Sequence, residues 1–149
     1  MLGALFLMLC LSGCETTGIG GWGGGPGEGR AERLASNGQH ADAAGEYIGL
    51  AANQSGLERD RLTLLAVEQW LDAGDVTRAR NAFRGVVRPG GGPLRWLWNT
   101  GSAGLYLYDG EPEAALAILE AMSLESLPRR DRLRVEALRA ALSAAQASP

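Results

Sequence analysis

The feature that most constrains the fold of this chain is a glycine that recurs at a constant interval of 36 residues, at Gly38, Gly74 and Gly110. An apolar stretch with helical spacing precedes each glycine, and another follows it. Internal repeats of about 20 to 50 residues are typical of arrays in which each unit is one supersecondary motif. The interval therefore predicts a repeated unit that turns at each glycine.

Side-chain size recurs in phase with this glycine. The residues seven before and five after it are small or β-branched: Ala31, Val67, Ala103, Ala43, Ala79 and Ala115. The residues four before, nine after and twelve after it are larger: Leu34, Trp70, Tyr106, Tyr47, Phe83, Leu119, Leu50, Val86 and Met122. Small residues let two helices approach and large ones fill the space between them. The pattern predicts a helix hairpin in each repeat, with the glycine as the left-handed C-terminal cap of the first helix. Asp75 and Pro112 suit the start of the second helix, as a capping residue and a first-turn proline.

This order of small, glycine, aromatic and alanine positions resembles the tetratricopeptide repeat over roughly residues 30–122. The resemblance implies an all-α, tetratricopeptide-like helical-hairpin solenoid of about three repeats plus a C-terminal helix. Two departures stand out: the interval is 36 residues where the family uses about 34, and Thr63 and Asn99 occupy the family's tryptophan position. Residues 124–147 are expected to form a seventh helix that packs on the third hairpin through Leu138, Leu142 and Ala145. It is either the cap that ends the array or the remnant of a longer one.

The N-terminus has the features of an export signal. Residues 1–11 are an apolar run that is too short for a membrane-spanning helix, which needs about 20 residues. The next residues, Leu11-Ser12-Gly13-Cys14, match the lipobox of bacterial lipoproteins. We therefore expect a signal peptide over residues 1–13 and a lipid-carrying Cys14, although the usual basic residues before the apolar run are missing. The alternative is a buried helix that happens to end in cysteine.

The segment that follows is expected to be a tether. Residues 14–29 comprise Cys14 and a glycine-rich stretch, which is flexible by composition. Two or more acyl chains on Cys14 would hold the protein stably in a bilayer. Glu15 replaces the aspartate that retains similar lipoproteins in the inner membrane, so we expect the periplasmic face of the outer membrane. The helical domain is expected over residues 30–149.

Composition argues against several classes of function. The net charge is -3, and we find no clustered basic face of the kind that nucleic acid requires. The only histidine is His40, which occupies a helix start, and the only cysteines are Cys10 and Cys14. Nucleophilic catalysis and metal binding need groups that converge on one point. We therefore expect no catalytic residue, no metal and no cofactor, and a protein that acts by binding.

The candidate partner-binding residues are two tryptophans. Trp96 and Trp98 follow the segment Pro89-Gly-Gly-Gly-Pro93, which is expected to form a longer loop than the first link between hairpins. We expect one ring to pack into the core and the other to be an exposed anchor, because tryptophan is enriched at binding hot spots.

A second resemblance concerns function. The run Arg59-Asp-Arg-Leu-Thr-Leu-Leu-Ala-Val-Glu-Gln-Trp-Leu-Asp-Ala-Gly-Asp-Val-Thr-Arg-Ala79, preceded by Ala43-Ala-Gly-Glu-Tyr47 and a lipobox, resembles the N-terminal helical domain of the LpoA family. These outer-membrane lipoproteins activate a class A penicillin-binding protein, which implies a regulator of peptidoglycan synthesis. In that family a second, periplasmic-binding-protein-like domain follows, whereas this sequence stops at Pro149. If the chain is complete, we expect a scaffold in place of an activator. Two alternatives stay open: a generic lipid-anchored adaptor for envelope, secretion or pilus assembly, and a module that binds a small ligand or peptidoglycan.

Overall fold

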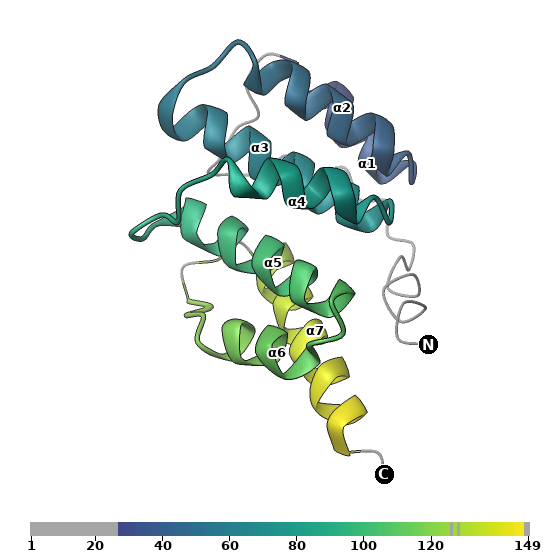
Figure 1. Cartoon of the computed structure of the whole chain (residues 1–149), viewed down its shortest axis with the longest axis vertical. Coiled ribbons are helices and arrows are strands. Elements are labelled where there is room, and N and C mark those ends of the chain that lie inside the picture. The colour runs from purple at the N-terminus through teal and green to yellow at the C-terminus, as the bar shows by residue number, and fades with distance from the viewer. Residues whose placement is uncertain (1–26, 126, 128, 148–149) are drawn as a thin grey trace.

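The computed structural model describes residues 27–125, 127 and 129–147, and over these residues the chain forms seven α-helices and no strand (Figure 1). The helices are α1 (Glu28–Ser36), α2 (His40–Ala51), α3 (Gly56–Asp72), α4 (Val76–Arg84), α5 (Pro93–Tyr108), α6 (Pro112–Glu120) and α7 (Arg129–Ala147). Helices α1 and α2, α3 and α4, and α5 and α6 pack as consecutive antiparallel pairs. The prediction of an all-helical chain is confirmed for the described residues.

The three helix pairs turn at the glycines that recur in the sequence. Gly38, Gly74 and Gly110 have φ angles of 77°, 76° and 77°, which residues with a side chain rarely adopt. At each corner the residue after the glycine donates its amide to the carbonyl five residues earlier, at 2.9, 2.8 and 2.9 Å. This bond satisfies a carbonyl that the end of the helix would otherwise leave unpaired. The predicted corners are confirmed in position and in geometry.

The predicted starts of the second helices are also confirmed. Asp75 precedes α4, and its Oδ1 accepts the amide hydrogen of Arg78 at 3.1 Å. Pro112 is the first residue of α6, where a missing amide hydrogen costs nothing because no carbonyl lies in reach.

The small and β-branched positions of the repeat are buried in all three helix pairs. All six are buried to at least 98% of their surface: Ala31, Ala43, Val67, Ala79, Ala103 and Ala115. Among the large residues, Tyr47, Trp70 and Leu119 are buried, whereas Tyr106 in the third pair is 37% exposed. Burial at the small positions thus follows the repeat more strictly than burial at the large ones.

The second and third helix pairs meet mainly through α3 and α5. A Cβ atom at Gly104 would lie 2.7 Å from Cδ1 of Leu71, and one at Gly101 would lie 3.3 Å from Cε2 of Phe83. Glycine at these two positions of α5 lets the second and third pairs pack closely. The recurring pattern of the sequence does not include either residue.

The last helix begins later than the sequence predicts. Helix α7 starts at Arg129, and the expected start at Leu124 is wrong. Pro128 lies between the two positions, and proline disfavours a helical conformation for the residue before it. The helix packs on α6, as predicted, through Leu138 and Leu142, together with Val135, which is 1% exposed. The side chain of Ala145 lies outside the described set.

Arg139 fixes α7 to the end of α6. Its guanidinium donates to the carbonyl oxygens of Leu119 and Met122, the latter at 2.9 Å. These carbonyls lie at or just beyond the C-terminus of α6, where a positive charge also meets the negative end of the helix dipole. The last turns of α7 project beyond the other helices (Figure 1).

The first helix begins before the predicted domain boundary. Helix α1 starts at Glu28, whose side chain is almost fully buried, so residues 28 and 29 belong to the helical domain and not to the tether. The predicted signal peptide and Cys14 lie outside the described residues. Of the helices that are described, none combines the length and apolar character needed to cross a bilayer.

Candidate functional site

A small cavity lies where α3, α5, α6 and α7 meet. Its apolar wall is formed by Leu71, Ala103, Gly104, Leu107, Leu119 and Leu138. Four polar side chains complete the lining: Glu68, Asp72, Thr100 and Arg134. The cavity measures about 20 Å³, enough for one water molecule. It is far smaller than the roughly 300 Å³ of a typical ligand pocket, so the residues around it act on one another.

Glu68 is the central polar residue of this cavity. We call Glu68, Asp72, Thr100 and Arg134 the Glu68 cluster. The residue is 7% exposed. The Thr100 hydroxyl on α5 donates to its Oε1 at 2.7 Å. Arg134 on α7 places Nη1 3.8 Å from Oε2 of Glu68 and Nη2 3.5 Å from Oδ1 of Asp72. Three helices thus meet around one carboxyl group.

Burial controls the charge of Glu68. Desolvation raises the pKa of this carboxyl, and the charge of Arg134 and the hydrogen bond from Thr100 oppose the rise only in part. Asp72 and Asp131 raise it further by repulsion. A carboxyl with a raised pKa can act as a general acid, but that requires a substrate within hydrogen-bond reach. Because the cavity holds no more than a water, proton uptake is the chemistry that this arrangement supports.

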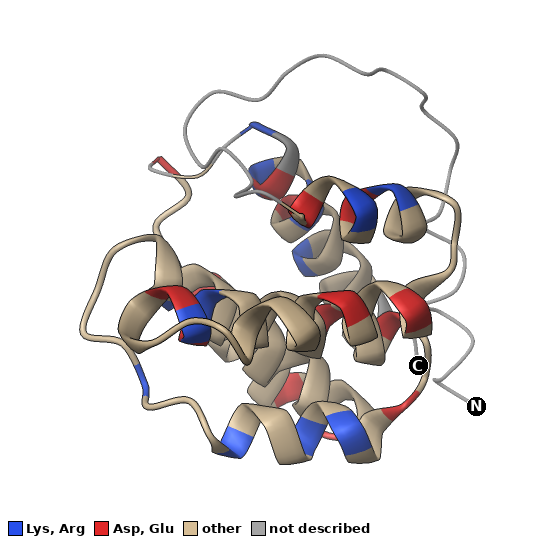
Figure 2. Cartoon of the chain, turned by 90° about the horizontal axis from the view of Figure 1, so that it is seen from above, with Lys and Arg blue, Asp and Glu red and all other residues tan. Residues whose placement is uncertain are grey.

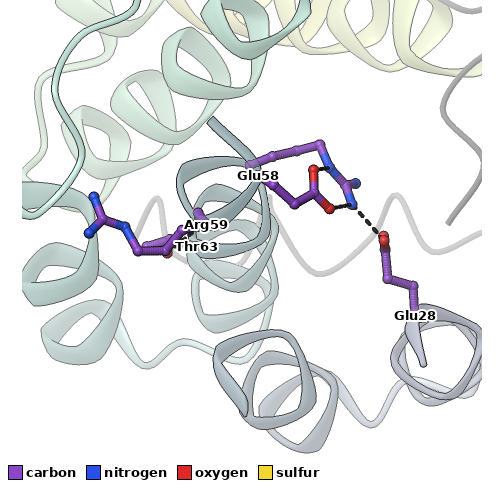
Figure 3. A network of polar contacts seen from close by, with 5 residues as sticks. Glu28, Glu58, Arg59 and Thr63 are labelled. Carbon is purple, nitrogen blue, oxygen red and sulfur yellow. Dashed lines mark hydrogen bonds and ion pairs between the residues drawn. The ribbon is translucent and has the colours of Figure 1, made fainter. Parts of the chain in front are cut away.

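A second polar cluster ties α1 to α3, and we call Glu28, Glu58 and Arg61 the Arg61 cluster (Figure 3). Nη2 of Arg61 lies 2.5 Å from Oε1 of Glu28 and 2.7 Å from Oε1 of Glu58. Nε of Arg61 also donates to Oε2 of Glu58 at 2.9 Å. This forked hydrogen bond lowers the pKa of Glu58. The cluster holds α1, which sequence reasoning had partly assigned to the tether.

Tyr47 of α2 is electrostatically coupled to the Arg61 cluster. Burial, with the negative charges of Glu32 and Glu28, raises the pKa of its phenol to about 12. The phenol therefore keeps its proton at neutral pH and offers no phenolate nucleophile.

His40 makes a structural contact. Its Nδ1 lies 2.9 Å from Oε1 of Gln69, so the ring joins the start of α2 to α3. Over the described part of the chain, no group of three or more histidine, cysteine, aspartate or glutamate side chains is arranged to hold a metal ion.

The two candidate tryptophans are both half-buried. The Trp98 ring lies against Phe83, with ring centroids 5.1 Å apart, and the guanidinium of Arg88 lies 5.2 Å from the Trp98 centroid. Trp96 packs against two apolar clusters, one of which contains α7 residues. The loop before them, residues 85–92, is longer than the link at residues 52–55, as predicted. The structure brings both rings to the N-terminal half of α5, and neither is as exposed as Val87, at 82%.

Charged side chains are spread over several helices in Figure 2.

The Glu68 cluster was not identified from the sequence, although one signal exists. Glu68 and Asp72 lie four residues apart among apolar residues of α3, and a buried charge at such a position needs a partner from another element. Which element supplies that partner depends on tertiary packing alone.

Comparisons with protein-family models, with curated proteins and with solved structures found no match for this chain.

Proposed function

We propose that this chain is a lipid-anchored adaptor of the bacterial envelope, whose tetratricopeptide-like array binds a partner protein and catalyses no reaction. The observation that supports this proposal is the recurrence of left-handed glycine corners every 36 residues, each flanked by buried small residues. Stacked helix pairs expose extended surfaces that suit protein binding.

The anchor in this proposal is Cys14, with a signal peptide over residues 1–13 and residence at the periplasmic face of the outer membrane. The support is the sequence Leu11-Ser12-Gly13-Cys14 behind a short apolar run. Cells that express the chain should incorporate radiolabelled palmitate into it, and Cys14→Ala should abolish the label. Fractionation should then place the labelled protein with outer-membrane markers. Equal labelling of the variant would contradict the anchor.

The partner that the family resemblance implies is a class A penicillin-binding protein, which makes the chain a regulator of peptidoglycan synthesis. The test is capture from a detergent-solubilised envelope followed by a glycan-polymerisation assay with the purified synthase. We expect capture of the synthase and a higher polymerisation rate. Capture of a secretion or pilus component would favour the generic adaptor, and binding to purified sacculi without any protein would favour a peptidoglycan-binding module.

Trp96 and Trp98 are the candidate partner contacts in this proposal. If one ring contributes to binding, Trp96→Ala or Trp98→Ala should weaken capture more than it lowers the melting temperature. Phe83→Ala is a matched control, because it removes an aromatic contact of Trp98 from the other helix pair. Equal thermal destabilisation by both tryptophan variants, with capture unchanged in the folded protein, would assign both rings to the core.

A further inference from the structure

Helix α7 contacts two different helix pairs. Its apolar face packs on α6 of the third pair through Val135, Leu138 and Leu142. Its Arg134 also reaches Glu68 and Asp72 on α3 of the second pair. The Glu68 cluster is therefore the place where the last helix is joined to the middle of the molecule.

Burial of Glu68 depends on α7. Thr100 of α5 contacts this carboxyl directly, and Arg134 and Leu138 of α7 complete the wall of its cavity. If α7 moved away, water would reach the carboxylate from that side. A buried carboxylate is costly unless a charged or hydrogen-bonding group pairs with it. Nη1 of Arg134 lies 3.8 Å from Oε2 of Glu68, which is beyond hydrogen-bond distance, and 45% of the Arg134 side chain is exposed to water. The docked position of α7 therefore disfavours the charged form of Glu68.

We propose that Glu68 and Arg134 form a proton-controlled latch, in which α7 docks most firmly on α3 when Glu68 is neutral and loosens when Glu68 ionises. The proposal is independent of the partner and of the lipid anchor. It concerns the geometry of the Glu68 cluster, which the function proposed above does not use.

The direction of the effect follows from the groups that face Glu68. On α3 and α7, Asp72 and Asp131 disfavour a second negative charge, while Arg134 favours it. On α5, Thr100 stabilises the charged form by its hydrogen bond, and α6 contributes the apolar Leu119 to the cavity. Desolvation outweighs the favourable contacts, so the docked form holds its proton to higher pH than an open form would. Acid then favours docking, and each unit of pKa difference between the two forms changes the docking equilibrium about tenfold.

Hydrogen exchange of the α7 amides in the full chain tests this proposal. A helix that leaves its packing surface loses protection, because most of the stability of a helix in a protein comes from tertiary packing. After division by the intrinsic exchange rate at each pH, the protection of α7 should fall by about threefold to tenfold between about pH 4 and pH 8. The amides of α2, which do not contact the cluster, should keep constant protection and report that the chain stays folded.

Three variants separate the latch from ordinary packing. Glu68→Gln keeps an oxygen that accepts from Thr100, and it should remove the pH dependence and leave α7 more protected at neutral pH. Arg134→Gln should enlarge the loss of protection, because the buried carboxylate then has no counter-charge. Arg132→Gln removes the same charge from α7 two residues away and should behave like the unchanged chain. Constant α7 protection across the pH range, a pH dependence that persists in Glu68→Gln, or equal behaviour of the two arginine variants would each overturn the latch.

Discussion

Helix α3 carries two glutamates, ten residues apart, whose pKa values move in opposite directions. The pKa of Glu58 is lowered, chiefly by the hydrogen bonds from Arg61, and that of Glu68 is raised, chiefly by burial. Both have an arginine nearby, but Arg61 bonds to Glu58 at 2.7 Å, whereas Arg134 lies 3.8 Å from Glu68. The side chain of Glu58 is 46% exposed and that of Glu68 is 9% exposed. A nearby arginine therefore does not fix the charge of a carboxyl, because direct bonding and access to water decide it.

This difference has opposite consequences for stability. Glu58 contributes stability above its unfolded pKa, and the contribution is lost as pH falls through its lower folded pKa. Glu68 holds a proton more tightly when folded, so its contribution is fully present below its unfolded pKa and is lost as pH rises through its higher folded pKa. One end of α3 thus favours neutral pH, and the other favours acid.

The largest change should come from removing the arginine that is well bonded. Arg61→Ala would remove the guanidinium that pairs with the buried Glu28, and we expect a loss of about 3 kcal/mol in the free energy of unfolding, the cost of breaking a buried pair. Urea unfolding at neutral pH measures it. Arg59→Ala is the matched control, because Arg59 is 54% exposed and bonds to its neighbour Asp60, so its loss should cost less than about 0.5 kcal/mol. Similar losses in the two variants would mean that the buried ion pair of the Arg61 cluster contributes no more to the free energy of unfolding than an exposed one.

A smaller change should follow from removing the hydroxyl that supports Glu68. Thr100→Val keeps the shape of the side chain but removes its hydrogen bond to Glu68, so we expect a loss of about 1.5 kcal/mol at a pH where Glu68 is ionised. The loss should shrink in acid, where Glu68 is neutral. Thr63→Val is the control, since the Thr63 hydroxyl donates to the backbone carbonyl of Arg59 on the surface of the same helix. If the loss for Thr100→Val does not change with pH, the hydroxyl does not stabilise the charged form.

The smallest change concerns Glu58 itself. Glu58→Gln should destabilise the chain by no more than about 0.5 kcal/mol at neutral pH, because water screens a pair with one half-exposed partner. The difference from the unchanged chain should vanish as pH falls below the folded pKa of Glu58. Thermal unfolding at neutral and acid pH measures it, and a destabilisation that grows in acid would reverse the assigned direction of the pKa shift.

Sequence reasoning succeeded where the cause is local. A left-handed corner needs glycine, and a proline in the first turn or a capping aspartate stabilises the start of a helix through groups only a few residues away. The roles of Gly38, Pro112 and Asp75 could therefore be assigned without tertiary contacts. It failed at α7, where Leu124 continues the apolar pattern but Pro128 delays the helix. Apolar periodicity marks a face that can be buried, and it does not mark the residue at which the helix begins.

The candidate site illustrates the opposite case. Trp96 and Trp98 stand out in the sequence, yet both are half-buried, and Trp98 contacts Phe83 of α4 and Arg88 of the preceding loop. Glu68 is inconspicuous in the sequence because its partners, Thr100 and Arg134, lie 32 and 66 residues further along the chain. Spacing within one helix cannot reveal such a pair.

The sequence alone determined the number of helix pairs, the residues at which they turn and the small side chains along which their helices touch. Each of these depends on backbone conformation or on side-chain volume, which repeat wherever the same residues repeat. Tertiary structure alone decided which carboxyls lose contact with water and which arginine reaches each of them. Charge and protonation depend on the dielectric surroundings of a group, and only the packing of distant helices creates those surroundings.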